Sequence, residues 1–196
     1  MAPWTIDHIR ARLERAAADA APHDPPERRA AVAIALELGE SPRVLLMRRT
    51  AHPQDPWSGQ VSLPGGRREP EDGDLVETAV RETREELSVD LLAHASLLGP
   101  MAPVQARARG RVVPMDVSPF VFALEREVAP APSEEAEEAF WLPLDRALRG
   151  DLDHQYRYEG TDGLVRKLPS WRFEERVVWG LTYGILSRLL TTLGGG

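Results

Sequence analysis

The stretch from Gly65 to Asp90, GGRREPEDGDLVETAVRETREELSVD, constrains the fold more than any other part of the chain. Apolar side chains recur in it at helical spacing and form one face: Leu75, Val76, Ala79, Val80, Thr83 and Leu87. This periodicity predicts an amphipathic helix over Asp74–Leu87, shortly after a Gly-Gly turn. On that helix Glu82, Glu85 and Glu86 stand at i, i+3 and i+4, so three carboxylates share one side at the border of the apolar face.

These three carboxylates repel one another, whereas helices usually place a Lys or Arg four residues from a Glu. A tight acidic cluster beside a glycine turn is typical of a site where oxygen ligands hold a hard divalent cation, Mg²⁺ or Mn²⁺. Such a cation would neutralise a diphosphate, polarise it and activate a water for in-line attack at phosphorus. Arg81 can hold one carboxylate through a bidentate pair. Spacing alone leaves a second interpretation open, a solvated acidic helix without a ligand.

The rest of the chain alternates apolar runs with polar turns. The patterns predict strands over 30–38 and 43–49 and near 95–100 and 112–125, with short apolar pieces at 61–63 and 140–144. They predict further helices over 5–19, up to residue 149 and over 176–193, whereas 151–170 gives no clear signal. Two prolines exclude helix from a linker at 21–29. Strands mixed with helices, including hairpin-like neighbours, favour an α/β sandwich over a doubly wound parallel sheet.

Composition excludes several classes of protein. The chain has no cysteine, which excludes a disulfide scaffold and a thiolate metal site and fits a reducing compartment. Its net charge of −7 argues against a nucleic-acid-binding surface. No apolar run approaches the roughly 18 residues of a membrane span, and the N-terminal segment lacks the apolar centre of a secretory signal. We therefore expect a cytoplasmic protein without a membrane or nucleic-acid partner.

The stretch after the glycine pair closely resembles the Nudix box, GX5EX7REUXEEXGU, in which U is aliphatic. The core of the box is present as Arg81-Glu82-Thr83-Arg84-Glu85-Glu86. Gly66 matches the opening glycine and Val89 the closing aliphatic residue. The metal-binding core is intact, and on it the chain is identified as a member of the Nudix hydrolase superfamily.

Two departures from the box are visible. Ser88 stands where the box has its second glycine. The spacing from the opening glycine to the arginine is one residue longer than the pattern, so we assign the early acid to Asp74, Glu69 or Glu71. This extension, with an Asp at position 74, is similar to the branch of Nudix enzymes that cleave coenzyme A.

The resemblance to this branch continues upstream. Its motif has a Leu-Leu strand, an Arg followed by a small residue, a second Arg, and then Gly and Phe-Pro-Gly-Gly. Leu45-Leu46, Arg49-Thr50 and Gly59–Gly66 match this motif, with Leu63 in place of Phe. Asp55 occupies the place of the second Arg, in a loop that is one residue longer.

The far end of the chain is similar to the same branch. Glu135 precedes the apolar segment at 140–144, and Trp179–Thr182 opens the last helix. The resemblance therefore covers about residues 30–193, which we interpret as one Nudix domain. Residues 1–29 would form an N-terminal helix and linker packed on that domain.

The resemblance implies an α/β fold, the Nudix α/β/α sandwich with a mixed β-sheet, and Mg²⁺ or Mn²⁺ as cofactor. It implies hydrolysis of the pyrophosphate bond in a nucleoside diphosphate linked to another group, with coenzyme A or acyl-coenzyme A as the leading substrate. ADP-ribose, dinucleotides or nucleoside triphosphates are the alternative, because Asp55 departs from the motif proposed to recognise coenzyme A. A nucleotide sensor without turnover is a third reading, against which the intact glutamate set argues. The partner is thus a small nucleotide, and the choice between monomer and homodimer stays open.

The same resemblance assigns roles to individual residues. The metal ligands would be Glu82, Glu85, Glu86 and Gly66, the catalytic residues Glu82, Arg81 and Glu135, and the substrate-binding residues Arg49 and Arg67. For two of them the residues themselves leave another reading open. Glu135 lies in an acidic run, SEEAEEAF, that is also typical of a solvated loop. Arg49 is also explained as a surface charge at the end of a strand.

Overall fold

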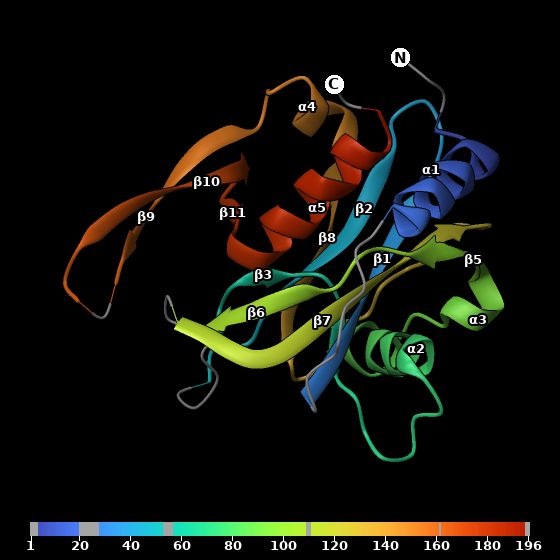
Figure 1. Ribbon diagram of the computed structural model, residues 1–196, viewed down its shortest axis with the longest axis horizontal. Helices are drawn as coiled ribbons and strands as arrows, with labels where there is room; N and C mark the ends of the chain where they lie inside the picture. The colour runs from blue at the N-terminus through green and yellow to red at the C-terminus, as the bar shows by residue number, and fades with distance from the viewer. Residues whose placement is uncertain (1–3, 20–27, 53–56, 109–110, 161, 195–196) are drawn as a thin grey trace.

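A mixed β-sheet forms the centre of the molecule, and helices pack on both of its faces (Figure 1). The structure, a computed structural model, describes residues 4–19, 28–52, 57–108, 111–160 and 162–194. The strands of this sheet are β1 (Arg28–Glu37), β2 (Arg43–Arg49), β3 (Val61–Ser62), β4 (Gly65–Arg67), β5 (Ala95–Pro100), β6 (Val104–Ala108), β7 (Arg111–Leu124) and β8 (Ala136–Pro143). The helices are α1 (Ile6–Ala18), α2 (Leu75–Leu87), α3 (Leu91–His94), α4 (Leu144–Leu148) and α5 (Gly180–Thr192). A smaller sheet contains β9 (Asp153–Glu159), β10 (Val165–Phe173) and β11 (Arg176–Trp179).

The order of the strands explains why the central sheet is mixed. The main path runs β3-β2-β1-β7-β5, with β4 paired to β1, β6 to β7 and β8 to β2. The long β1–β7 pair is parallel, from Arg28 opposite Met115 to Leu36 opposite Ala123, and the other pairs of this sheet are antiparallel. The predicted α/β class with a mixed sheet is confirmed.

Side-chain alternation along β1 supplies apolar contacts to both layers of helices. Ala31, Ala33 and Ala35 point to the face covered by α2, where their small side chains allow the helix to approach closely. Ile34 and Leu36 point to the opposite face, where they pack with buried residues of α1 and α5. A strand buried on both faces reads as one continuous apolar run, as this one does.

The predicted N-terminal helix is confirmed as α1. It begins after Thr5, whose side-chain oxygen accepts a hydrogen bond from the His8 backbone N–H at 3.3 Å. Ile9 and Leu13 are buried against α5 and the sheet. Residues 14–19 are all exposed, so the helix packs on the body only along its first two turns.

The last predicted helix is wrong over its first four residues. Residues 176–179 form strand β11, which pairs with β10 in antiparallel register, and the helix begins at Gly180. Val177, Val178 and Trp179 favour a strand, and Val178 is fully buried there. Gly180 has φ +62°, a left-handed conformation that separates strand from helix.

Other elements differ from the sequence expectation in extent. The stretch 151–170, which gave no clear signal, contains β9 and much of β10, a hairpin that extends from the body in Figure 1. Strand β6 was not predicted. Strand β1 starts at Arg28, inside the expected linker, because its parallel pairing with β7 extends that far; residues 20–27 of the linker lie outside the described residues. None of the described helices is long and apolar enough to cross a membrane.

Candidate active site

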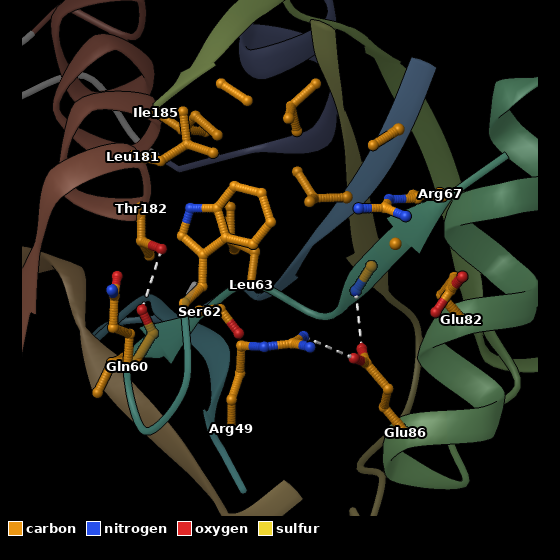
Figure 2. Close-up of a pocket in the computed structure, with 18 of the residues that line it drawn as sticks. Arg49, Gln60, Ser62, Leu63, Arg67, Glu82, Glu86, Leu181, Thr182 and Ile185 are labelled. Carbon is orange, nitrogen blue, oxygen red and sulfur yellow. Dashed lines mark hydrogen bonds and ion pairs between the residues drawn. The ribbon is translucent and has the colours of Figure 1, made fainter. Parts of the chain in front are cut away.

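A cavity of about 490 Å³ extends from α2 to α5 along the central sheet (Figure 2). It lies within the usual size range of small-molecule sites, roughly 300–1,000 Å³. Six of the residues predicted for the site line it: Arg49, Gly66, Arg67, Glu82, Glu86 and Glu135. Arg81 and Glu85 are not among its lining residues.

Glu86 is the most buried charged group of this site, with a side chain that is 2% exposed. Its Oε2 accepts a hydrogen bond from the Gly65 backbone N–H at 2.8 Å, and its Oε1 lies 3.4 Å from Nη1 of Arg49. Burial raises the pKa of Glu86 to about 8, and the charges of Glu82 and Glu135 add to the rise. The hydrogen bond from the Gly65 N–H and the positive charge of Arg49 lower the pKa and so offset part of this rise. Negative charge at this position is therefore incompletely compensated by the protein.

The two glycines of the turn are required by close contacts. Gly65 has φ +149°, and a Cβ on it would collide with the backbone of β1 at Ala31. A Cβ on Gly66 would collide with the carboxylate of Glu82. The turn therefore brings backbone polar groups directly against the acidic side of α2, as the sequence predicted for Gly66.

Arg81 lies behind the cavity and ties its acidic groups together. Its Nη1 contacts Oε1 of Glu82 at 3.0 Å and Oε2 of Glu85 at 2.9 Å. Its Nε and Nη2 form a bidentate pair with Asp72, both at 3.0 Å, and Nη2 also donates to the carbonyl of Arg67 at 3.1 Å. One side chain thus links α2 to the turn, which supports its predicted orienting role.

Asp72 is a residue that the sequence analysis missed. Its side chain is 6% exposed, accepts a hydrogen bond from Thr78 Oγ1 at 2.8 Å, and has a pKa held far below its usual range, chiefly by Arg81. Asp74, one of the three acids considered, instead caps the start of α2 by accepting from the Glu77 N–H. The signal was present: Asp72 follows Gly66 at the interval that the box requires, so the additional residue lies between Asp72 and Arg81.

Glu82 and Glu85 occupy different environments. Burial raises the pKa of Glu82, although Arg81 opposes that rise, and its carboxylate lies against Gly66 at the cavity wall. The Glu85 side chain is 54% exposed and contacts Arg81. The structure therefore brings Glu82 and Glu86 together in the cavity and places Glu85 at its outer border.

Glu135 reaches the cavity from the other side of β2. Its backbone carbonyl accepts from the Thr50 N–H at 2.9 Å, next to a bulge in the β2–β8 pairing. Bulges of this kind commonly redirect side chains beside active sites. The Glu135 side chain is exposed yet lines the cavity, so the acidic run joins Glu82 and Glu86 at a shared space. Arg67, at the end of β4, lines the same space.

The donor set suits a hard divalent cation in its chemistry. Glu82, Glu86 and Glu135 provide carboxylate oxygens, Gly66 lies directly against Glu82, and the raised pKa of Glu86 marks negative charge that a cation would compensate. Within the part of the chain that the structure describes, no three such side chains are already gathered into a closed metal shell. In this arrangement the carboxylates contact Arg81, Arg49 and backbone N–H groups instead.

The other part of the cavity has an apolar lining that the sequence analysis did not foresee. Its aliphatic side chains come from β3 and the residue after it, β7 and α5: Val61, Leu63, Met115, Val117, Leu181 and Ile185. Trp57 also lines the cavity, and its indole N–H donates to the carbonyl of Arg107 at 2.9 Å. These segments are far apart in the chain, so no local sequence pattern predicts that they line the same cavity.

Fold and site together define a class: an α/β/α sandwich in which an acidic helix follows a Gly-Gly turn beside a deep cavity. Comparison with known proteins gives the family. The model of the NUDIX domain matches residues 27–160. The chain therefore belongs to the Nudix hydrolase family, whose members are pyrophosphohydrolases.

Relatives among known proteins agree with this assignment. The chain is 35% identical over 163 residues to a protein of Yersinia enterocolitica described as uncharacterized Nudix hydrolase NudL, covering 82% of this chain and 78% of that one. A NudL of Pectobacterium atrosepticum is 31% identical over 164 residues, covering 83% and 81%. Among solved structures, a binary complex of the C. elegans Ap4A hydrolase superposes with a TM-score of 0.51 at 20% identity, covering 62% of this chain and 84% of that one. This last likeness shows the fold alone.

Proposed function

We propose that the protein is a Mg²⁺- or Mn²⁺-dependent hydrolase of the pyrophosphate bond in a nucleoside diphosphate linked to another group. The observation that carries the proposal is the convergence of Glu82, Glu86 and Glu135 on a cavity that is also lined by Arg49 and Arg67. Carboxylates serve as cation ligands and bases, whereas the two guanidinium groups suit phosphate oxygens. A phosphate ligand in a chain of net charge −7 requires such local cations.

In the reaction, a water oxygen forms a bond to phosphorus as the bridging P–O bond breaks. The bound cation would neutralise the diphosphate and lower the pKa of the attacking water. Glu82, Glu85 and Glu86, with the Gly66 carbonyl, are its proposed ligands. The Glu82 or Glu135 carboxylate takes the proton from water, Arg81 orients Glu82, and Arg49 and Arg67 hold phosphate oxygens.

Coenzyme A or acyl-coenzyme A is the substrate that we propose first. The upstream motif at 45–50 and 59–66 supports it, because its residues form β2 and the turn beside the cavity. Asp55, the departure from that motif, lies outside the described residues. Cleavage of coenzyme A would give 4′-phosphopantetheine and adenosine 3′,5′-bisphosphate.

ADP-ribose, dinucleotides and nucleoside triphosphates form the second candidate class, supported by the same acidic cluster. A sensor without turnover is a third candidate, and the full glutamate set argues against it because binding alone does not need a general base. The cytoplasmic location and the choice between monomer and homodimer stay predictions from the sequence.

A chromatographic hydrolysis panel tests the proposal. The purified protein is incubated with Mg²⁺ or Mn²⁺ and coenzyme A, ADP-ribose, NADH, diadenosine polyphosphates or nucleoside triphosphates, and the products are separated. We expect metal-dependent cleavage that EDTA abolishes, with coenzyme A turned over at the highest kcat/KM. Absence of turnover on every compound would favour the sensor, and preference for a dinucleotide would favour the second class.

A further inference from the structure

Two arginines contact the acidic side of α2, and the protein holds them in different ways. Arg81 forms a bidentate pair with Asp72, with both distances at 3.0 Å, and also donates to a backbone carbonyl of the glycine turn. The contact of Arg49 with Glu86 is longer, 3.4 Å from Nη1 to Oε1. Hydrogen bonds between charged groups are usually about 2.7–2.9 Å long, so the Arg49–Glu86 contact is weak and easily exchanged.

Strand β2 directs Arg49 towards the acidic helix. Leu45 and Met47 pack with the apolar face of α2, and side chains two residues apart on a strand share a face, so Arg49 points the same way. Figure 2 shows its guanidinium extending towards Glu86. The Arg49 side chain is 25% exposed and that of Glu86 is 2% exposed. The arginine therefore has access to the open cavity, whereas the glutamate stays in the wall.

Arg49 lies against the part of Glu86 that a cation would use. Oε2 of Glu86 accepts from the Gly65 N–H at 2.8 Å, and Oε1 faces Arg49. A divalent cation bound to this carboxylate would bring two positive charges next to the guanidinium. Like charges at such short separation repel each other, so Arg49 and the cation compete for one carboxylate.

A released Arg49 has another partner available in the same cavity. Arg49 and Arg67 both line it, and the oxygens of a diphosphate suit the planar guanidinium group. A diphosphate that entered before the cation would meet Arg49 already engaged with Glu86. It would also meet carboxylates whose charge the protein compensates only in part. The order in which the two ligands bind is therefore not neutral.

We propose that Arg49 exchanges between Glu86 and the substrate. In the cation-free protein its guanidinium holds Glu86, and when a cation takes that carboxylate, Arg49 moves to a phosphate oxygen. Arg49 thereby makes diphosphate binding depend on the cation, and by thermodynamic linkage the diphosphate strengthens cation binding by the same factor. The inference rests on the proposed cation-dependent hydrolysis and adds how its two ligands are coupled.

Titration of metal-free protein with Mn²⁺, followed by electron paramagnetic resonance of the free ion, tests the competition without turnover. Arg49→Gln removes the competing charge, so we expect it to bind Mn²⁺ about 5–10-fold more tightly than wild type. Arg67→Gln is the matched control: Arg67 lines the same cavity, whereas the ion pairs of Glu82 and Glu86 are made by Arg81 and Arg49. We expect this control to change the affinity less than about 2-fold.

The outcomes of the Mn²⁺ titration separate this inference from the proposed function. Equal tightening in both variants would reflect only the lower positive charge of the cavity and would overturn the exchange. Equal affinity in wild type and both variants would overturn it too, while the cation site itself stands. If none of the three proteins binds Mn²⁺, the inference and the proposed function fail together.

Calorimetry with ADP in EDTA tests the same exchange from the diphosphate side. Glu86→Gln releases Arg49 without any cation, so we expect ADP to bind about 5–10-fold more tightly than to wild type. Glu82→Gln is the control, because it removes a carboxylate charge from the same cavity lining but contacts Arg81 rather than Arg49. The gain from Glu86→Gln should disappear when Arg49→Gln is also present. A gain that persists in the double variant, or equals that of Glu82→Gln, would overturn the inference.

Discussion

The cavity has two ends: an α2 end with Glu82 and Glu86, held together by charges and hydrogen bonds, and an α5 end with Leu181 and Ile185, held together by apolar packing. At the α2 end, Arg81 contacts Asp72, Glu82 and Glu85, and Glu86 accepts from the Gly65 N–H. At the α5 end, apolar side chains from β3, β7 and α5 meet. In the proposed function, the first arrangement would hold the diphosphate, and the second would contact the group attached to it.

The two ends also differ in how the chain builds them. Residues of the α2 end come mostly from one continuous segment, 65–86, so their geometry follows from a local turn and one helix. Residues of the α5 end come from segments more than a hundred positions apart. A substitution at the α5 end therefore leaves the contacts within the acidic cluster in place.

The largest expected effect is the loss of charge at Glu86. Glu86→Gln keeps the shape of the side chain but removes a proposed cation ligand, and we expect kcat to fall by about 10²–10⁴. The fold should survive, because the substitution removes charge repulsion from a buried position. Steady-state kinetics in saturating Mg²⁺, with circular dichroism as the folding control, check this. Turnover near the wild-type rate would remove Glu86 from the site.

The next effect concerns the anchor of Arg81. Asp72→Asn removes one charge from a bidentate pair, so we expect a loss of about 1–3 kcal/mol in unfolding free energy and about 10–100-fold in kcat. Asp162→Asn is the control, because the Asp162–Arg166 pair is exposed and distant from the cavity lining. Urea unfolding and kinetics are measured for both variants. If the two lose equal stability, the Asp72 pair is only a surface contact.

A smaller effect is expected at Glu135. Glu135→Gln should lower kcat at least about 10-fold with little change in KM, because a base acts mainly in the transition state. Glu134→Gln and Glu137→Gln provide matched controls in the same acidic run, and neither residue lines the cavity. Similar kinetics for all three variants would mean that the run is a solvated loop.

A separate effect appears in the stability of metal-free protein as pH changes. The pKa of Glu86 in the folded protein is raised from 4.5 to about 8. Below pH 4.5 the group is protonated in both the folded and the unfolded protein, so the free energy of unfolding does not change with pH through this group. Between pH 4.5 and 8 the unfolded chain releases that proton first, so stability falls as pH rises. In EDTA we expect the Tm of Glu86→Gln to exceed that of wild type by a margin that grows from pH 5 to 8. A margin independent of pH would contradict the buried charge.

Much of the α2 end was predictable from the sequence, because helical periodicity and the Nudix box are both patterns within one short segment. The helix bounds, the glycine turn and the convergence of Glu82 with Glu86 follow from spacing between 65 and 87. Ser88 replaces a glycine in a left-handed position, φ 56°, which explains why the box places glycine there. Asp72 was missed because the additional residue was placed before it rather than after it.

The α5 end and the small sheet were not predictable in the same way. Strand β11 was read as helix because its apolar residues adjoin a real helical pattern, and only tertiary pairing with β10 decides between the two. The apolar lining carries no local sequence signal, because Val61, Leu63, Leu181 and Ile185 lie far apart in the chain. Long-range packing, rather than local propensity, determines this region.

We propose that the α2 end performs the same chemistry on every substrate, whichever group is attached to the diphosphate. The most direct measurement is kcat for dephospho-coenzyme A and for ADP-ribose, in wild type and Glu86→Gln, with saturating Mg²⁺. We expect the variant to lose the same factor, about 10²–10⁴, on both substrates. A loss confined to one substrate, or no loss on either, would contradict it.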